Sequence, residues 1–350
     1  MEEIYIKKEY AKNNLMYLAR IELTTKCNFR CKHCFIDDFG KAGLSKEEIF
    51  MLLDNLRKFG VYAVEFTGGE IFTRPDIMEI IRYARKLKFS VSLLSNLYLL
   101  TDEIIDELTS LSIEAISTTL FSMSDEINDK ITCHRNSASK VIDNLLKLAK
   151  SNISIEVKTI VMSDNAGEYR AIQEFCNQNG FCYLATEGIF PEMNGNEAPR
   201  KLAMTLEQLR NCIYDLDTIR FGGLYKKDKS DDTPICCELH YSLFIGADGE
   251  CYPCNLWFKK LGNIRSYNYD ISLLWNSPIL LQVRQMTWKD LKKCSHCKNS
   301  AYCIRCTGIV DAIKGNLLME DPYACRTALA RKETDNDHIV HCLNPEKTIQ

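Results

Sequence analysis

Residues 18–35 read LARIELTTKCNFRCKHCF, a short apolar segment that leads directly into a loop with three cysteines. The alternation of apolar and polar residues in 18–24 predicts a β-strand. Cys27, Cys31 and Cys34 follow within eight positions. Three thiolates are too many for one disulfide and one too few for a closed four-ligand metal site. The loop therefore predicts a metal centre with an open coordination position.

The strand at 18–24 is the first of six that alternate with amphipathic helices. Further strands are expected at 61–68, 90–96, 113–119, 154–162 and 181–188, and helices at 45–60, 75–88, 102–111, 137–151, 166–179 and 205–219. A strand followed by a helix about every 25–35 residues indicates parallel βαβ units with right-handed crossovers. Six strands are two short of a closed barrel, so we expect an α/β fold, a partial (β/α)6 TIM-like barrel. Its ligands would bind at the carboxyl ends of the strands.

Composition narrows the class of protein. The 350 residues carry a net charge of −3, and lysine and arginine are scattered, which does not favour nucleic-acid binding. The first residues, MEEIYIKKEYAKNN, have charges of both signs and no apolar run, so they do not form a signal peptide. No run approaches the ~18 apolar residues of a membrane helix. We expect a cytoplasmic protein without membrane contact, whose 17 cysteines suit metals better than disulfides.

The cysteines are unevenly distributed and mark out the expected domains. The expected segments are an N-terminal extension (1–17), the barrel (18–220), a linker (221–235), a cysteine-rich domain (236–330) and a C-terminal tail (331–350). Nine cysteines fall between 236 and 325. Five stand alone and are expected to be small buried hydrophobic residues, namely Cys133, Cys176, Cys182, Cys212 and Cys342.

Zinc is one alternative for the first loop, with His33 as fourth ligand, but His33 is adjacent to Cys34 and would strain a shared tetrahedral site. The pattern Cys27-x3-Cys31-x2-Cys34, with a ring before the last cysteine, instead resembles the radical S-adenosylmethionine (radical SAM) superfamily. TGGE at 67–70 is similar to its second motif. The resemblance implies a [4Fe–4S] cluster whose open iron binds SAM. Reductive cleavage of SAM would then give a 5′-deoxyadenosyl radical that abstracts hydrogen from a C–H bond.

The same resemblance implies further contacts to SAM. Gly68, Gly69 and Glu70 would contact its methionyl end, and Ser95 and Asn96, at the end of the third strand, would contact the ribose. Ser117 ends the fourth strand and is a further candidate contact, and Lys130 or Lys158 would bind the carboxylate. Each position has a simpler alternative, because strand-end polar residues also cap helices and lone lysines are usually solvated. The general base is unassigned; Glu187 is the weak candidate, with Glu65 and Glu192 unranked beside it.

A second cysteine set follows the barrel. CSHCKNSAYCIRC gives Cys294, Cys297, Cys303 and Cys306, with five residues between the pairs where a zinc ribbon needs about 15–20. Together with CCELHYSLFIGADGECYPC (236–254) and Cys325, this order resembles the SPASM extension of radical SAM enzymes, which binds two auxiliary [4Fe–4S] clusters. The implied ligands are Cys294, Cys297, Cys303 and Cys325 for the second auxiliary cluster and Cys237, Cys254 and Cys306 for the first, with Cys236 and Cys251 competing for its fourth position. The expected total is three clusters.

Two departures from the SPASM pattern carry consequences. Only two residues separate Cys303 from Cys306, where relatives usually have three, which leaves the division of ligands open. Asn255 stands where sulfatase-maturing relatives carry an aspartate thought to act as a base, and an amide accepts no proton at neutral pH. Sulfatase maturation is therefore disfavoured.

The resemblance implies a peptide-modifying enzyme. We expect an oxidative crosslink in a ribosomally made precursor peptide, with a thioether as first choice and a C–C or C–N link as second. The alternatives are a dehydrogenase of a protein side chain or small alcohol, and a non-enzymatic multi-cluster electron carrier. A flavodoxin- or ferredoxin-type protein would supply electrons. Only about seventeen residues precede the first strand, too few for the leader-binding domain that many such enzymes carry, so we expect the leader to be bound by a separate protein, by the SPASM domain, or not at all.

Overall fold

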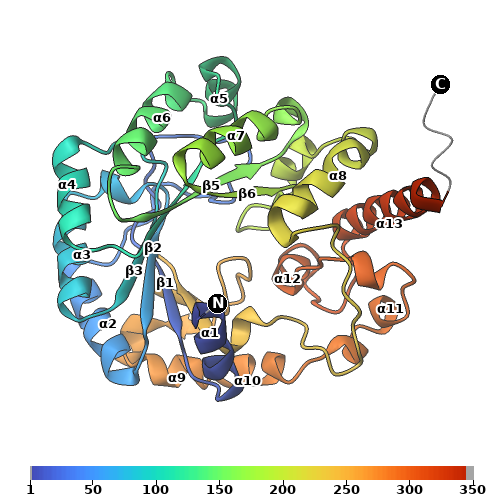
Figure 1. Ribbon diagram of the computed structural model, residues 1–350. Helices are drawn as coiled ribbons and strands as arrows, with labels where there is room; N and C mark the ends of the chain where they lie inside the picture. Colours follow the sequence, from blue (N-terminus) through green and yellow to red (C-terminus); the bar gives the residue numbers. More distant parts are fainter. Residues whose placement is uncertain (1, 344–350) are drawn as a thin grey trace.

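The computed structural model describes residues 2–343, and its first six strands are parallel and alternate with helices, as predicted (Figure 1). The strands are β1 Leu18–Glu22, β2 Ala63–Thr67, β3 Ser90–Leu94, β4 Ala115–Thr119, β5 Ser154–Ile160, β6 Cys182–Thr186, β7 Ser242–Ile245, β8 Glu250–Tyr252 and β9 Gly262–Asn263. The helices are α1 Glu2–Lys12, α2 Lys46–Phe59, α3 Ile77–Lys86, α4 Asp102–Ser110, α5 Asp125–Thr132, α6 Ser137–Leu148, α7 Tyr169–Asn179, α8 Leu206–Phe221, α9 Ile271–Trp275, α10 Pro278–Arg284, α11 Lys292–Ser295, α12 Thr307–Lys314 and α13 Pro322–Leu343.

Local sequence signals set the ends of the predicted helices. At the start of α2, the Ser45 hydroxyl accepts from the Glu48 amide at 3.2 Å, and the Glu48 carboxylate accepts from the Ser45 amide at 2.7 Å. Gly60 ends the helix in the left-handed conformation, with φ of 94°. The predicted capping box and C-cap are therefore confirmed.

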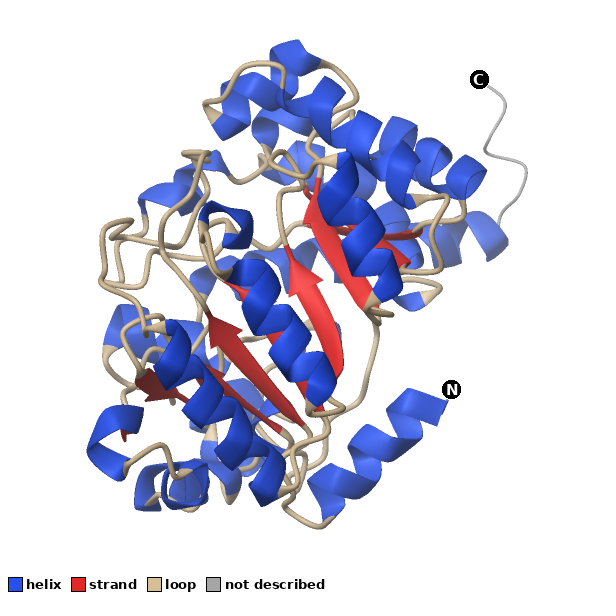
Figure 2. Ribbon diagram, turned by 90° about the vertical axis from the view of Figure 1, so that its left-hand side faces the viewer, coloured by secondary structure: helices blue, strands red, loops and turns tan. Residues whose placement is uncertain are grey.

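The sheet extends beyond the six barrel strands. Its strand order is β6-β5-β4-β3-β2-β1-β7-β8-β9. Strand β7 pairs with β1 in parallel, with Leu18 opposite Ser242, while β8 and β9 are antiparallel. Figure 2 shows the strands side by side, with helices across their outer face. The partial-barrel fold class is confirmed, and the cysteine-rich region continues the same sheet.

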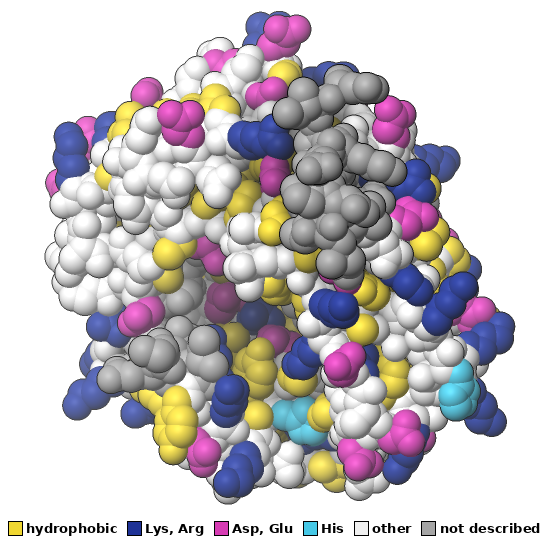
Figure 3. All heavy atoms as spheres, turned by 45° about the vertical axis from the view of Figure 1, so that its right-hand side comes forward, with side chains coloured by type: hydrophobic (Ala, Val, Ile, Leu, Met, Phe, Trp, Pro, Cys, Tyr) yellow, Lys and Arg dark blue, Asp and Glu magenta, His cyan; other side chains and the backbone are white. Residues whose placement is uncertain are grey.

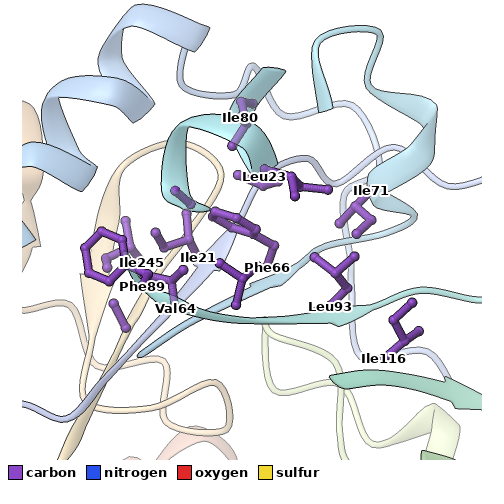
Figure 4. Packing of buried hydrophobic residues seen from close by; sticks show 14 of the residues in the cluster. Ile21, Leu23, Val64, Phe66, Ile71, Ile80, Phe89, Leu93, Ile116 and Ile245 are labelled. Carbon is purple, nitrogen blue, oxygen red and sulfur yellow. The ribbon is translucent and has the colours of Figure 1, made fainter. Parts of the chain in front are cut away.

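That continuity changes how the cysteine-rich region is stabilised. The cysteines of this region predict metal binding, but its apolar residues also belong to the main core. Ile245 of β7 packs beside Ile21 of β1 (Figure 4), and Trp257 and Trp275 are only 1% exposed. Burying side chains of this size contributes about 2–3 kcal/mol each, so much of this region is stabilised without iron.

The last helix is not a tail. Helix α13 packs along α8, which ends the barrel segment (Figure 1). Arg331 of α13 is 1% exposed, and its guanidinium pairs with Asp217 of α8 at 2.7 Å and with Glu187 after β6 at 2.7 Å. The expected boundary at residue 331 therefore falls inside a packed helix, at the residue that ties it to the barrel. Residues 344–350 of the expected tail lie outside the described residues.

The outer surface shows mixed charge. On the face drawn in Figure 3, lysine and arginine side chains alternate with aspartate and glutamate around a central hollow. Across residues 2–343, no helix combines the length and apolar character that a bilayer crossing requires.

Candidate active site

The three cysteines of the loop after β1 lie together on the wall of one cavity. Cys27, Cys31 and Cys34 line a cavity of about 270 Å³, whose other walls come from the carboxyl ends of β2 to β6. Burial raises the pKa of Cys27 to about 11 and raises the pKa values of Cys31 and Cys34 as well, and the charges of the three thiols act on one another. Metal binding at this loop must release protons, because thiolates are the ligands.

Helix α5, which was not predicted, holds this loop. The backbone amides of Arg30 and Lys32 donate to carbonyls in the last turn of α5, both at 3.0 Å. The signal was present in the sequence, since Ser124 caps the helix and two acidic residues follow in its first turn. Cys133, the C-cap of α5, is exposed.

The isolated cysteines divide into two kinds. Cys176 and Cys212 are buried, as predicted. Cys133 and Cys182 are exposed, so the prediction of buried hydrophobic residues is wrong for them; one caps a helix and the other begins edge strand β6. The side chain of Cys342 lies outside the described residues.

The glycine pair after β2 lets two backbone segments pack closely. A Cβ on Gly68, which has φ of 155°, would lie 2.3 Å from the Thr24 carbonyl oxygen, and one on Gly69 would lie 2.3 Å from that of Lys26. The Gly69 amide donates to the Thr24 carbonyl at 2.8 Å. Both glycines line the cavity. They are thus required to seat the cysteine loop itself, in addition to allowing a ligand to approach.

Glu70 organises the next strand end from behind. It is fully buried and is not among the residues that line the cavity. Its carboxylate accepts hydrogen bonds from the Phe72 amide at 3.0 Å, the Ser95 hydroxyl at 2.8 Å and the Asn96 amide at 2.6 Å. Burial nevertheless raises its pKa. Ser95 and Asn96 do line the cavity, and the Asn96 side-chain amide donates to Asn28 of the cysteine loop at 2.8 Å.

The two candidate lysines lie in different places. Lys158 lines the cavity and pairs with Glu156 at 2.7 Å, while the Ser117 hydroxyl donates to the same carboxylate at 2.8 Å. Although burial works in the opposite direction, the Lys158 ammonium holds the pKa of Glu156 below its usual range. Lys130 is exposed outside the cavity and pairs with Asp164 at 3.1 Å. Glu156 was missed, although it precedes Lys158 by two residues and so shares its face of β5.

His33 contributes an uncharged ring to the cavity. Its imidazole packs edge-on against Phe121, with 4.8 Å between ring centroids, and burial lowers its pKa to about 4. Its Nδ1 atom is buried without a hydrogen-bond partner. Within residues 2–343, no three His, Cys, Asp or Glu side chains are arranged to hold a single metal ion. A [4Fe–4S] cluster is a larger body and spaces its thiolates more widely.

The candidate general bases are engaged elsewhere. Glu187 is not among the cavity-lining residues, and its carboxylate pairs with buried Arg331. Glu65 pairs with Arg20 at 2.5 Å, and Glu192 accepts a hydrogen bond within its own turn. The structure thus places Glu187 in the contact between α13 and the barrel and brings none of the three to the cavity wall.

The cysteines after residue 235 form two groups. The first thiol group is Cys236, Cys254 and Cys306; the second thiol group is Cys294, Cys297, Cys303 and Cys325. Within each group, the charge of one ionised thiol raises the pKa of its neighbours. Cys237 is exposed and is not part of the first group, whereas Cys251 is buried, with its thiol directed to the Gly249 carbonyl at 3.7 Å.

Comparisons with known proteins agree with this geometry. Residues 21–176 match the model of the radical SAM superfamily, and residues 236–298 match that of the SPASM iron–sulfur cluster-binding domain. The chain is a radical SAM enzyme with a SPASM domain.

Relatives within this superfamily are distant. The chain is 23% identical to an AdoMet-dependent heme synthase of Methanosarcina barkeri, over 89% of this chain and 97% of that protein. It is 26% identical to the antilisterial bacteriocin subtilosin biosynthesis protein AlbA of Bacillus subtilis, over 82% and 66%. The fold is similar to Streptococcus suis SuiB bound to its precursor peptide SuiA, with a TM-score of 0.69 at 15% identity, over 92% and 80%.

The residues present fit the cofactors of this superfamily. Three thiols, two glycines and an unpartnered imidazole nitrogen line a single cavity. Bound there, an iron–sulfur cluster and SAM would supply the radical chemistry of hydrogen abstraction. The protein's own contribution is to hold these groups in a pocket with several aromatic side chains, among them Phe29, Phe35 and Phe190, which limit the access of water.

Proposed function

We propose that this enzyme is a peptide maturase that takes hydrogen from a residue of a ribosomally made precursor peptide and closes an oxidative crosslink. The observation that supports this most is the presence of two separate thiol groups beyond the SAM cavity, in a region that matches the SPASM domain. Two groups suit two auxiliary clusters, which makes three clusters in all. A thioether is the first choice of bond, and a C–C or C–N link the second.

The grouping of the thiols supports one set of ligands for the auxiliary clusters. We assign the second cluster to the second thiol group, which has four members, and the first cluster to Cys236, Cys254 and Cys306. Cys237 was the expected ligand, but it is exposed, while burial raises the pKa of Cys236 to about 12 beside Cys306. Iron analysis tests this directly: Cys236→Ala should remove one cluster's iron and Cys237→Ala should not, and the reverse result would restore the original assignment.

Four cavity residues are proposed to hold SAM. Backbone groups of Gly68 and Gly69 face the methionyl end, the Lys158 ammonium suits its carboxylate, and Asn96 suits the ribose. Glu70 is assigned a positioning role, because its hydrogen bonds fix Asn96 without reaching the cavity.

A peptide substrate draws its support from relatives. AlbA acts in bacteriocin biosynthesis by its name, and SuiB, whose fold is similar, has been solved with a precursor peptide. A flavodoxin or ferredoxin is the proposed electron donor, and a separate protein the proposed leader-binding partner.

Isotope transfer tests the peptide proposal. The anaerobically reconstituted enzyme would receive SAM, dithionite and synthetic peptides from short reading frames beside its gene, with one residue type deuterated at a time. The proposal predicts deuterium in 5′-deoxyadenosine and a peptide that has lost two hydrogen atoms. In a thioether-crosslinked peptide the cysteine thiol is no longer alkylated, and the peptide fragments as a ring in mass spectrometry. These two properties distinguish it from the product of a simple dehydrogenase. Deoxyadenosine without deuterium from any peptide would contradict the proposal.

A second candidate function has one observation in its favour. The match to the heme synthase covers 97% of that protein, more than the 66% of AlbA that is covered. A tetrapyrrole would then replace the peptide as substrate. Incubation with iron-containing haem precursors distinguishes the two, because conversion of the precursor to haem, detected by chromatography and mass spectrometry, would favour this candidate and exclude the first.

A further inference from the structure

One arginine lies between the two thiol groups. Arg305 follows Cys303 of the second group by two residues and directly precedes Cys306 of the first. The segment that connects the two groups therefore contains a permanent positive charge, since a guanidinium stays protonated in proteins.

Backbone and side-chain acceptors hold this guanidinium in place. Its Nη1 donates to the Thr307 hydroxyl at 2.9 Å, and its Nη2 donates to the carbonyls of Leu317 and, at 2.7 Å, Met319. Its Nε is buried without a hydrogen-bond partner. Among residues 2–343, no carboxylate forms an ion pair with Arg305. Its charge is thus fixed in position without an ion pair to a carboxylate.

The anchors of the guanidinium lie beside both groups, since the Thr307 hydroxyl also donates to the carbonyl of Ile235, next to Cys236, and Leu317 packs with Cys294 against the same buried residues. Although burial opposes its charged state most, the thiols of Cys294 and Cys303 in the second group and of Cys306 in the first favour it, in that order, followed by the carboxylate of Asp321. Reciprocally, the guanidinium stabilises the thiolates of all three.

We propose that Arg305 is a positioning residue that raises the reduction potentials of both auxiliary clusters together. This inference rests on the proposed function only in requiring that both thiol groups hold clusters. Each one-electron reduction adds negative charge to a cluster, and net charge and hydrogen bonding to sulfur are among the factors that set its potential. A fixed positive charge in a partly buried site stabilises the reduced form more than the oxidised one.

Lys229 provides an internal comparison. Its ammonium donates to the carbonyl of Cys303 at 3.0 Å, and its charge acts on the thiol of Cys303. It is not among the charges that act most strongly on the first thiol group. Removal of Lys229 should therefore affect the second cluster only, whereas removal of Arg305 should affect both.

Redox titration followed by electron paramagnetic resonance tests the proposal. The background is the full chain with Cys27, Cys31 and Cys34 replaced by alanine, so that only auxiliary clusters are titrated. We expect Arg305→Gln to lower both midpoint potentials, by about 59 mV or more for a tenfold change in a one-electron equilibrium. The shift should be larger for the second cluster, which supplies two of the three thiols concerned. Lys229→Gln should lower only one potential.

Arg326→Gln is the matched control. Arg326 directly follows Cys325 and also has a buried, unpartnered Nε, yet it is not among the charges that act most strongly on the second thiol group. Its variant should keep both potentials. If Arg305→Gln fails to bind iron, Arg305→Lys decides, because retained charge should leave both potentials near wild type and a fall in both would overturn the proposal.

The outcomes separate this inference from the proposed function. Absence of iron beyond the first loop in the wild type would contradict the two-cluster assignment itself. Full iron content with unchanged potentials in Arg305→Gln would overturn only the role of Arg305. A shift in one cluster alone would also overturn it, because the guanidinium would then act on a single group.

Discussion

Replacement of Arg331 by methionine tests how the SPASM region is fastened to the barrel. The Arg331 side chain is 1% exposed, as is that of Asp217, and the third partner, Glu187, is 10% exposed. Nε and Nη2 of the guanidinium make a two-pronged contact with Asp217, at 2.7 and 2.9 Å. Methionine keeps much of the apolar stem and removes the charge, so two buried carboxylates lose their shared cation.

The expected cost follows from that burial. Breaking a buried ion pair from one side costs about 3–5 kcal/mol, because the remaining charge has no partner. Arg210 offers a matched control, since it pairs with Glu333 across the same two helices at 2.6 Å but both side chains are more than a third exposed. Exposed pairs contribute about 0–1 kcal/mol, so Arg210→Met should be nearly neutral.

Urea unfolding followed by circular dichroism measures both variants. Arg331→Met should lower the free energy of unfolding by at least about 3 kcal/mol, and Asp217→Asn in the same background should recover part of the loss, since it removes one stranded charge. Equal and small effects of Arg331→Met and Arg210→Met would refute the view that this buried cation fastens α13 to the barrel.

Three further predictions concern the SAM cavity and its surroundings. Gly69→Ala places a Cβ 2.3 Å from a backbone carbonyl of the cysteine loop and should cost about 1–3 kcal/mol and lower iron content, whereas Gly167→Ala, with nothing within 4 Å, should do neither. Burial raises the pKa of Glu22 to about 7 from an ordinary 4.5. The free energy of unfolding of the wild type should therefore fall by up to about 3 kcal/mol relative to that of Glu22→Gln as the pH rises from 4.5 to 7. Free energies of unfolding that change in parallel with pH in the two proteins would contradict this. Lys158→Met should weaken SAM binding about tenfold in calorimetry and Lys130→Met should not; equal affinities would exclude the lysine contact.

The barrel was predictable because its signals are local. Alternating apolar residues, the Ser45 capping box and Gly60 each act within one element, and the three cysteines act within one loop. The convergence of Cys27, Gly68 and Asn96 also followed, since parallel strands bring their carboxyl ends to one rim.

The remaining features depend on contacts between distant segments. Nothing in the sequence near Arg331 indicates that its partner is Asp217, 114 positions earlier, so part of a packed helix was taken for a tail. Strand β7 could be recognised as part of the barrel sheet only by its pairing with β1. Cys236 and Cys237 are equivalent in a spacing pattern, and only their burial separates them.

Formation of 5′-deoxyadenosine tests the central claim most directly. The protein would be reconstituted anaerobically with iron and sulfide and given SAM and dithionite, beside the variant in which Cys27, Cys31 and Cys34 are alanine. The open-site account predicts deoxyadenosine from the wild type and none from the variant, while the variant still binds iron at residues 236–325. Equal cleavage of SAM by both, or by neither while iron is bound at residues 236–325, would contradict it.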